Sequence, residues 1–385
     1  MKTSRHFLLW VLVCAGLCQY YISYHLDGEP PPNMKDLVEM NGYSLETYDV
    51  ETDDGYILGL YRVGSKGADL NNRTVVFLQH GLCAASEIFV STGIERSLAF
   101  LLADRGYDVW LGNNRGNQHS RRHRTLDIDS SEYWDFSYHE MGHHDLSAMI
   151  DKALTVSGQE KLEYVGHSLG THTLLVLLST RPEYNQKISQ GITLAPAVYS
   201  RQNKFYYGSY FALYYAKWRV KLWHSNWLPY VEKLGKLPFK FCSPDHPLSY
   251  FCYLVYISFG PSNQVHETAF ATTLSTALTS TSLKTFAQLA LNYDVDKFVR
   301  MDPDTNQPIA YDLSLVNTPI TLIYSDNDYI ARPQNVIRLN SELANSTLYN
   351  VPCEHFNHLD YLFGKNVVDL VYKKVIHLLQ GNSKY

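Results

Sequence analysis

The feature that most constrains the fold is the pentapeptide G-H-S-L-G at 166–170, which stands between an apolar run and a helical pattern. The run from Leu162 favours a buried strand, and the residues from Thr171 carry apolar side chains at three and four spacing. Glycines two residues before and after the serine let strand and helix meet in a sharp turn. The pattern predicts that Ser168 projects from this turn into a cleft.

A serine hydroxyl is weakly nucleophilic unless a base removes its proton, so the turn predicts an Asp and then a His further along the chain, each after a strand. The apolar run P-I-T-L-I-Y-S is followed by Asp326 and Asp328. The run S-T-L-Y-N-V-P is followed by His355 and His358. The residues alone leave both choices open.

Two backbone N–H groups are candidates for holding a negatively charged oxygen. The N–H of Leu169 lies at the start of the predicted helix, where a developing oxyanion is stabilised. The second donor is expected in the loop after an early buried strand, and T-V-V-F-L-Q leads directly into His80-Gly81-Leu82. The N–H of Leu82 is therefore the second candidate.

Strand and helix patterns alternate along most of the chain. Polar residues around Gly55 separate two β-rich stretches and predict a hairpin between Tyr48 and Val63. Runs that are apolar on successive residues favour strands buried on both faces, and they begin at Thr74, Tyr107, Leu162, Gly191, Pro319 and Ser346. Helical patterns begin at Ile94, Thr171 and Asn366. The alternation predicts an α/β fold with a mostly parallel sheet flanked by helices.

The alternation stops after Pro196 and resumes only at Pro319. Within this gap, the 55 residues 205–259 contain 18 aromatic residues, about a third, against 14% in the whole chain. We expect an aromatic-rich cap over the strand ends, where ligands bind in such folds. The predicted organisation is a core of 19–197 and 311–385 with a cap or lid insertion at 198–310.

The N-terminus has the pattern of a secretory signal peptide. Lys2 and Arg5 precede an uncharged run from Phe7 to Cys18, which predicts a signal peptide at 1–18. A signal anchor is the alternative, because the uncharged stretch continues to Ser23. Passage through the secretory pathway predicts a secreted or lysosomal protein.

Sequons and cysteines agree with the secretory pathway. Asn72 and Asn345 begin N-x-S/T sequons and are candidate glycosylation sites. Cys242 and Cys252 are close enough in sequence to pair, and Cys83 and Cys353 are taken as free thiols. The formal charge of −5, with no basic cluster longer than the four residues 121–124, argues against the broad basic face of a nucleic-acid-binding protein.

Two other functional classes remain as alternatives. His139-Glu140-Met141-Gly142-His143 is an H-E-x-x-H motif, which on a helix predicts a zinc metallopeptidase with Glu140 as base. Glu163, 20 residues beyond His143, is a candidate third ligand. The other alternative is a catalytically inactive member of the fold that only binds a partner.

The chain resembles the acid lipase family of α/β-hydrolases, which includes gastric and lysosomal acid lipases. The resemblance lies in H-G-L at 80–82, in G-Y-D-V-W-L-G-N-N-R-G-N at 106–117, in L-E-Y-V-G-H-S-L-G at 162–170 and in N-H-L-D-Y-L-F-G at 357–364. It covers most of the chain outside the predicted cap. The residue Leu169 stands where the family usually has Gln.

This resemblance implies Ser168 as nucleophile, Asp328 as acid and His358 as base, with Leu82 and Leu169 as oxyanion donors. It also implies a disulfide between Cys242 and Cys252. The implied activity is hydrolysis of neutral lipid esters, triacylglycerols or sterol esters, at a lipid-droplet or micelle surface. Neither a cofactor nor a metal is expected for this chemistry, and no protein partner is predicted.

Overall fold

The structure, a computed structural model, describes residues 32–70, 72–200, 249–302 and 304–382. The predicted signal peptide and residues 201–248 of the predicted cap lie outside these ranges. Within them, no helix combines the length and the apolar character needed to cross a membrane.

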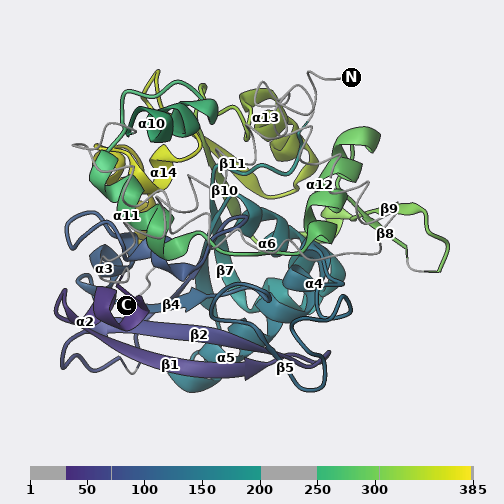
Figure 1. Cartoon of the computed structure of the whole chain (residues 1–385), viewed down its shortest axis with the longest axis horizontal. Helices are drawn as coiled ribbons and strands as arrows, with labels where there is room; N and C mark the ends of the chain where they lie inside the picture. The colour runs from purple at the N-terminus through teal and green to yellow at the C-terminus, as the bar shows by residue number, and fades with distance from the viewer. Residues whose placement is uncertain (1–31, 71, 201–248, 303, 383–385) are drawn as a thin grey trace, which may run out of the picture.

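Strands and helices alternate through the described residues (Figure 1). The strands are β1 (Tyr43–Glu51), β2 (Tyr56–Ser65), β3 (Val75–Gln79), β4 (Asp108–Gly112), β5 (Arg122–His123), β6 (Leu162–His167), β7 (Ile188–Leu194), β8 (Val299–Met301), β9 (Pro308–Ala310), β10 (Ile320–Tyr324) and β11 (Ser346–Asn350). The α-helices are α2 (Met34–Glu39), α3 (Leu98–Ala103), α4 (Tyr138–Glu140), α5 (Ser147–Ser157), α6 (Leu169–Thr180), α10 (Ser249–Ser258), α11 (Glu267–Ala277), α12 (Leu283–Val295), α13 (Pro333–Glu342), α14 (Asp360–Phe363) and α15 (Lys373–Asn382). Short 3₁₀ or π-helical turns are η1 (Ser86–Phe89), η2 (Met141–Leu146), η3 (Pro182–Gln186), η4 (Leu313–Leu315) and η5 (Val368–Tyr372).

The predicted hairpin is confirmed and is longer than its sequence pattern indicated. Strands β1 and β2 pair antiparallel from Tyr43 opposite Ser65 to Glu51 opposite Ile57. Gly55 in the turn has φ +96°, a conformation that glycine adopts without strain. The hairpin forms one edge of the sheet.

The main sheet has the order β1-β2-β4-β3-β6-β7-β10-β11, with β5 paired to β2. From β4 to β11 all neighbouring strands are parallel. The predicted α/β class with a mostly parallel sheet is therefore confirmed. In such a sheet the carboxyl ends of the parallel strands meet at one edge, so loops that follow β3, β6, β10 and β11 converge.

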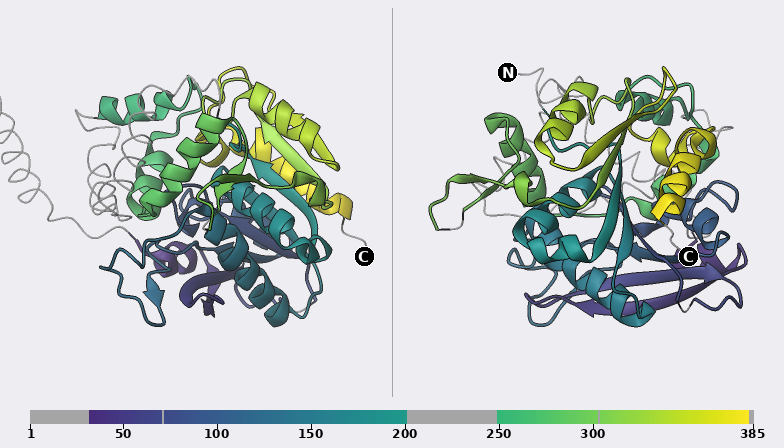
Figure 2. Two further views of the ribbon diagram at one scale, coloured as in Figure 1. Left: turned by 90° about the vertical axis from the view of Figure 1, so that its right-hand side faces the viewer. Right: turned by 180° about the vertical axis from the view of Figure 1, so that it is seen from behind.

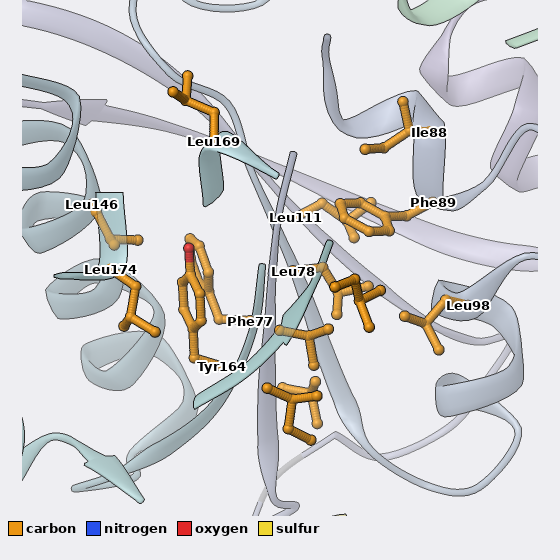
Figure 3. Close-up of a cluster of buried hydrophobic side chains, with 14 of the residues drawn as sticks. Phe77, Leu78, Ile88, Phe89, Leu98, Leu111, Leu146, Tyr164, Leu169 and Leu174 are labelled. Carbon is orange, nitrogen blue, oxygen red and sulfur yellow. The ribbon is translucent and has the colours of Figure 1, made fainter. Parts of the chain in front are cut away.

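Helices cover both faces of this sheet, which explains why strand β3 is apolar on successive residues from Val75 to Leu78. Successive side chains of a strand point to opposite faces. Figure 3 shows Phe77 beside Tyr164 and Leu174 on one face, and Leu78 towards the face that carries Leu98. All five residues of β3 are buried, as expected for a strand covered on both sides.

The segment between β7 and β10 contains helices α10, α11 and α12 and the small β8–β9 sheet. Figures 1 and 2 show α10 and α11 on the same side of the molecule as α14, with α12 and the β8–β9 hairpin on the other side. Strand β10 nevertheless pairs directly with β7. This long segment is thus an insertion between two neighbouring strands of the sheet.

Candidate functional site

Ser168 lies in the turn between β6 and α6, in a backbone conformation that is rare for a residue other than glycine. Its φ is 52° and its ψ is −109°. Such strained conformations occur where surrounding structure holds them, often at functional sites. The side chain is buried, with only 9% of its surface exposed.

The two glycines of the pentapeptide are required by close backbone contacts. A Cβ atom added to Gly166 would lie 2.9 Å from the carbonyl carbon of Gly170. A Cβ atom added to Gly170 would lie 2.8 Å from the backbone oxygen of Gln79 on β3. Because neither backbone can move away, only glycine fits at both positions, as the steric reading of the sequence predicts.

His358 lies in the loop after β11 and contacts Ser168. Its Nδ1 donates to Oδ2 of Asp328 at 2.8 Å, and since the carboxylate only accepts, Nδ1 carries the proton. Nε2 is therefore free to accept from Ser168 Oγ, which lies 2.9 Å away. A hydroxyl, an imidazole and a carboxylate thus form one continuous line of hydrogen bonds, in which the imidazole can remove the hydroxyl proton.

Asp328 is fully buried in the loop after β10 and is held from two sides. Its Oδ1 accepts the backbone N–H groups of Ile330 and Ala331 at 2.7 and 2.8 Å. Asp326, the other candidate acid, is exposed and accepts from the side chain of Asn350 at 3.1 Å. The structure therefore brings Asp328, and not Asp326, to the histidine.

His355, the other candidate base, is exposed, whereas His358 is buried. The ring of His358 packs between two aromatic neighbours. It lies 5.2 Å from the ring of His167 and 6.2 Å from that of Phe259, with which it is nearly parallel. These contacts fix the ring at the level of Ser168.

The loop after β3 runs directly against the serine. A Cβ atom added to Gly81 would lie 3.0 Å from Nδ1 of His167 and 3.2 Å from Cβ of Ser168, so the absence of a side chain at Gly81 leaves room for this close approach. Leu82 follows in the same loop, and Leu169 is the first residue of α6, whose N–H has no acceptor within the helix. A small cavity of about 10 Å³, lined among others by Gly81 and Leu169, adjoins this region and has room for about one water molecule.

Two buried histidines support the loop and the turn. His80 Nε2 accepts the backbone N–H of Asn114 at 3.1 Å, so Nδ1 carries the proton and donates to Gly81 O at 2.8 Å. Burial lowers the pKa of His80 to about 4 and that of His167 to about 3. Both rings are therefore neutral near pH 7 and hold the backbone without adding charge.

The H-E-x-x-H residues have other partners. His139 Nδ1 hydrogen-bonds to the hydroxyl of Tyr311 at 3.0 Å, and His143 Nδ1 to that of Thr180 at 2.9 Å. Glu140 accepts the backbone N–H of Ser137 at 2.7 Å in the capping box of α4. All three motif residues are thus used in local structure.

The helix carrying this motif is also irregular. Its regular turn α4 ends at Glu140 and continues as the π-helical turn η2, so His139 and His143 do not belong to one uniform helix. Glu163, the candidate third ligand, lies in β6. Among the described residues, no group of three or more His, Cys, Asp or Glu side chains is arranged to hold a metal ion.

The remaining predicted sites lie at the surface or partly outside the described residues. Asn72 and Asn345 are exposed. Cys252 is disulfide-bonded, and its predicted partner Cys242 lies outside the described residues. Cys83 and Cys353 are free thiols.

Sequence reasoning missed three buried polar residues around His358, namely Asn357, Asp360 and Tyr256. Asn357 and Asp360 are part of the N-H-L-D sequence, but the chemistry of the motif was assigned to its histidine alone. Tyr256 lies about 100 residues earlier, in α10. Only the polar character of two residues in an otherwise apolar stretch could have indicated their role.

Two family models and several known proteins match this chain over most of its length. A model of the partial alpha/beta-hydrolase lipase region matches residues 34–93, and a model of the alpha/beta hydrolase fold matches residues 74–362. Lipase 1 of Drosophila melanogaster is 37% identical over 89% of this chain and 78% of its own length. Gastric triacylglycerol lipase of Bos taurus is 32% identical over 92% of this chain and 93% of its own.

Solved structures with low sequence identity share the fold. A protein of Sulfolobus solfataricus superposes with a TM-score of 0.63 at 15% identity, covering 88% of this chain and 95% of that one. An esterase of Exiguobacterium antarcticum gives 0.51 at 14% identity, covering 87% of this chain and 100% of the other. At this identity the likeness concerns the fold alone.

Proposed function

The chain belongs to the acid lipase family of α/β-hydrolases and is an ester hydrolase, and on this premise we propose that it cleaves neutral lipid esters through Ser168, His358 and Asp328. The observation that carries the proposal is the line of two hydrogen bonds from Ser168 Oγ through the imidazole to the Asp328 carboxylate. The strained, close-packed turn at Ser168 supports it, because it presents the hydroxyl to the base.

In the proposed reaction, His358 Nε2 removes the proton of Ser168 as its Oγ attacks the ester carbonyl carbon. Asp328 keeps the proton on Nδ1 and stabilises the imidazolium that forms. The N–H groups of Leu82 and Leu169 hold the oxyanion of the tetrahedral intermediate. The imidazolium then protonates the leaving alcohol, and a water molecule activated by the same base hydrolyses the acyl-enzyme. No step requires a metal or an organic cofactor.

We place the substrate among triacylglycerols and sterol esters, taken from a lipid-droplet or micelle surface. Two considerations support this class. A relative that matches over most of the chain is a gastric triacylglycerol lipase. The predicted cap at 198–310 is rich in aromatic residues, which suits long apolar acyl chains.

We further propose that the protein passes through the secretory pathway and is secreted or lysosomal. The signal-peptide pattern at 1–18, the exposed sequons at Asn72 and Asn345, and the disulfide-bonded state of Cys252 support this route. Cys242 is the proposed partner of Cys252.

The test is hydrolysis of p-nitrophenyl esters from acetate to palmitate by wild-type protein and by Ser168→Ala. We expect a preference for long chains, at least a 10⁴-fold loss of kcat in the variant, and no effect of a chelator. The variant should keep the wild-type circular dichroism spectrum. Ester hydrolysis that survives in folded Ser168→Ala would contradict the proposal.

A further inference from the structure

Asn357, the residue before His358, is held by the carboxylate of Asp360, which lies two residues after the histidine. The backbone N–H of Asn357 donates to Oδ2 of Asp360 at 2.6 Å. In return, Oδ1 of Asn357 accepts the backbone N–H groups of Leu359 and Asp360 at 2.8 and 3.2 Å. Each residue thus caps the other, and the backbone of His358 lies inside this closed turn.

The same two residues connect the turn to helix α10 of the insertion. Nδ2 of Asn357 donates to the backbone oxygens of Tyr256 and Gly260 at 3.0 and 2.8 Å. The Tyr256 hydroxyl donates to Oδ1 of Asp360 at 2.5 Å, and Ser262 Oγ donates to the same oxygen at 3.0 Å. The end of α10 and the segment after it are therefore attached to the turn that carries His358.

This network is shielded from water. Asn357, Asp360 and Tyr256 are all fully buried. Burial raises the pKa of Asp360 to about 6, while the hydrogen bonds from Tyr256, Asn357 and Ser262 act in the opposite direction. In low-dielectric surroundings each of these hydrogen bonds is strong, and a donor left without its acceptor costs free energy.

Only part of this arrangement is needed to close a turn. Capping by Asn357 alone would close it, since its side chain accepts two N–H groups. Asp360 additionally joins the turn to a helix about 100 residues away, and it lies two residues after the histidine whose imidazole contacts Ser168. A link of this kind restricts the orientation of the imidazole and its distance from Ser168. A short turn closed by a single cap would restrict them less.

We propose that Asp360, acting through Asn357, is a positioning residue for His358, and that Tyr256 makes this positioning depend on how helix α10 is seated. The inference rests on the proposed function, because it takes His358 as the base. Small displacements of a catalytic group reduce the rate strongly even where substrate binding is unchanged.

The test compares Tyr256→Phe and Asp360→Asn with the control Tyr184→Phe. Tyr184 is also a buried tyrosine whose hydroxyl donates to a carboxylate, Asp151, at 2.8 Å, but it lies away from the site. Kinetics on p-nitrophenyl butyrate give kcat and KM, and a phosphonate ester that labels Ser168 reports the reactivity of the serine directly. The low-field proton resonance of the His358–Asp328 hydrogen bond reports the position of the ring.

We expect Tyr256→Phe to lower kcat and the labelling rate together by about tenfold, and Asp360→Asn by up to about 100-fold, with KM within twofold of wild type. The low-field resonance should shift or broaden in both variants. Tyr184→Phe should match wild type in every measurement. Rates are divided by the concentration of folded protein, which near-ultraviolet circular dichroism measures. If Asp360→Asn does not fold, Tyr256→Phe alone still tests the proposal.

Wild-type kcat, labelling rate and resonance in folded Tyr256→Phe would overturn the positioning role. So would a loss of kcat that equals the loss of folded protein. Failure of the proposed function would give a different result, because Ser168→Ala would then hydrolyse esters as fast as wild type.

Discussion

Two histidine and carboxylate clusters in this chain have similar sequence signatures and very different surroundings. In the first, His358 uses Nδ1 to contact Asp328 and Nε2 to contact a serine hydroxyl at the ends of parallel strands. In the second, the rings of His139 and His143 stack 5.6 Å apart, and their Nδ1 atoms contact structural hydroxyl groups. The second cluster contains the more regular motif, yet only the first aligns its groups for proton transfer.

This difference shows that the chemistry of a side chain depends on the groups that it contacts, and not on the spacing of its motif in the sequence. Glu140, which would be the base of a zinc peptidase, is used to cap α4. Gly142 lets the helix approach α6 closely, since a Cβ atom there would lie 2.6 Å from Val176. This helix is therefore built for packing, whereas the loop of His358 is built around one buried serine hydroxyl.

The largest expected effect separates the two histidines of the H-F-N-H sequence. His358→Gln should lower kcat for ester hydrolysis by about 10⁴- to 10⁶-fold, because the serine loses its base. His355→Gln should change kcat by less than about twofold, since the side chain of His355 is exposed. Single-turnover labelling of Ser168 by a phosphonate ester measures both. Equal losses in the two variants would contradict the assignment of His358 as base.

Most of the sheet could be predicted because its signals are local. Six apolar runs became six strands, and the two glycines around Ser168 reflect a steric requirement that is visible in five residues. The choice between Asp326 and Asp328 is not local. Both follow β10 by a few residues, and which one faces the imidazole depends on how the loops after β10 and β11 meet.

The network around Asp360 could not be predicted for the same reason. Its donors come from residues 256, 262 and 357, and only the fold brings them to one carboxylate. The π-helical turn η2 was also missed, because the H-E-x-x-H motif was interpreted on a regular helix. The only sign of such non-local contacts in the sequence is a polar residue within an apolar stretch.

Another buried histidine, His172, lies outside both clusters, and we expect it to change how the unfolding free energy depends on pH. Burial lowers the pKa of His172 to about 4 from about 6.5, so between these values the unfolded chain binds a proton that the folded chain does not. Stability from this group is complete above pH 6.5 and falls as the pH decreases towards 4, by about 3 kcal/mol.

His172→Phe should remove this dependence and keep the ring contacts with Tyr138 and Phe298. The loss of unfolding free energy between pH 7 and pH 4, measured by urea denaturation, should be smaller by about 3 kcal/mol in the variant. His377→Phe, at an exposed position, is the matched control. An unchanged pH dependence in His172→Phe would show that this ring does not contribute to acid destabilisation.

The smallest expected effect belongs to the second cluster. His139→Ala removes one hydrogen bond to Tyr311 and should lower the unfolding free energy by about 1 kcal/mol, while kcat for ester hydrolysis stays within about twofold of wild type. Adding a chelator should change neither the unfolding free energy nor the kcat of either protein. If a chelator-sensitive peptide cleavage were found in wild type and lost in His139→Ala, the H-E-x-x-H residues would have a catalytic role. In that case the metal ion would have to bind at Nε2 of both histidines, because their Nδ1 atoms hydrogen-bond the hydroxyl groups of Tyr311 and Thr180, which also fix the directions of the two rings.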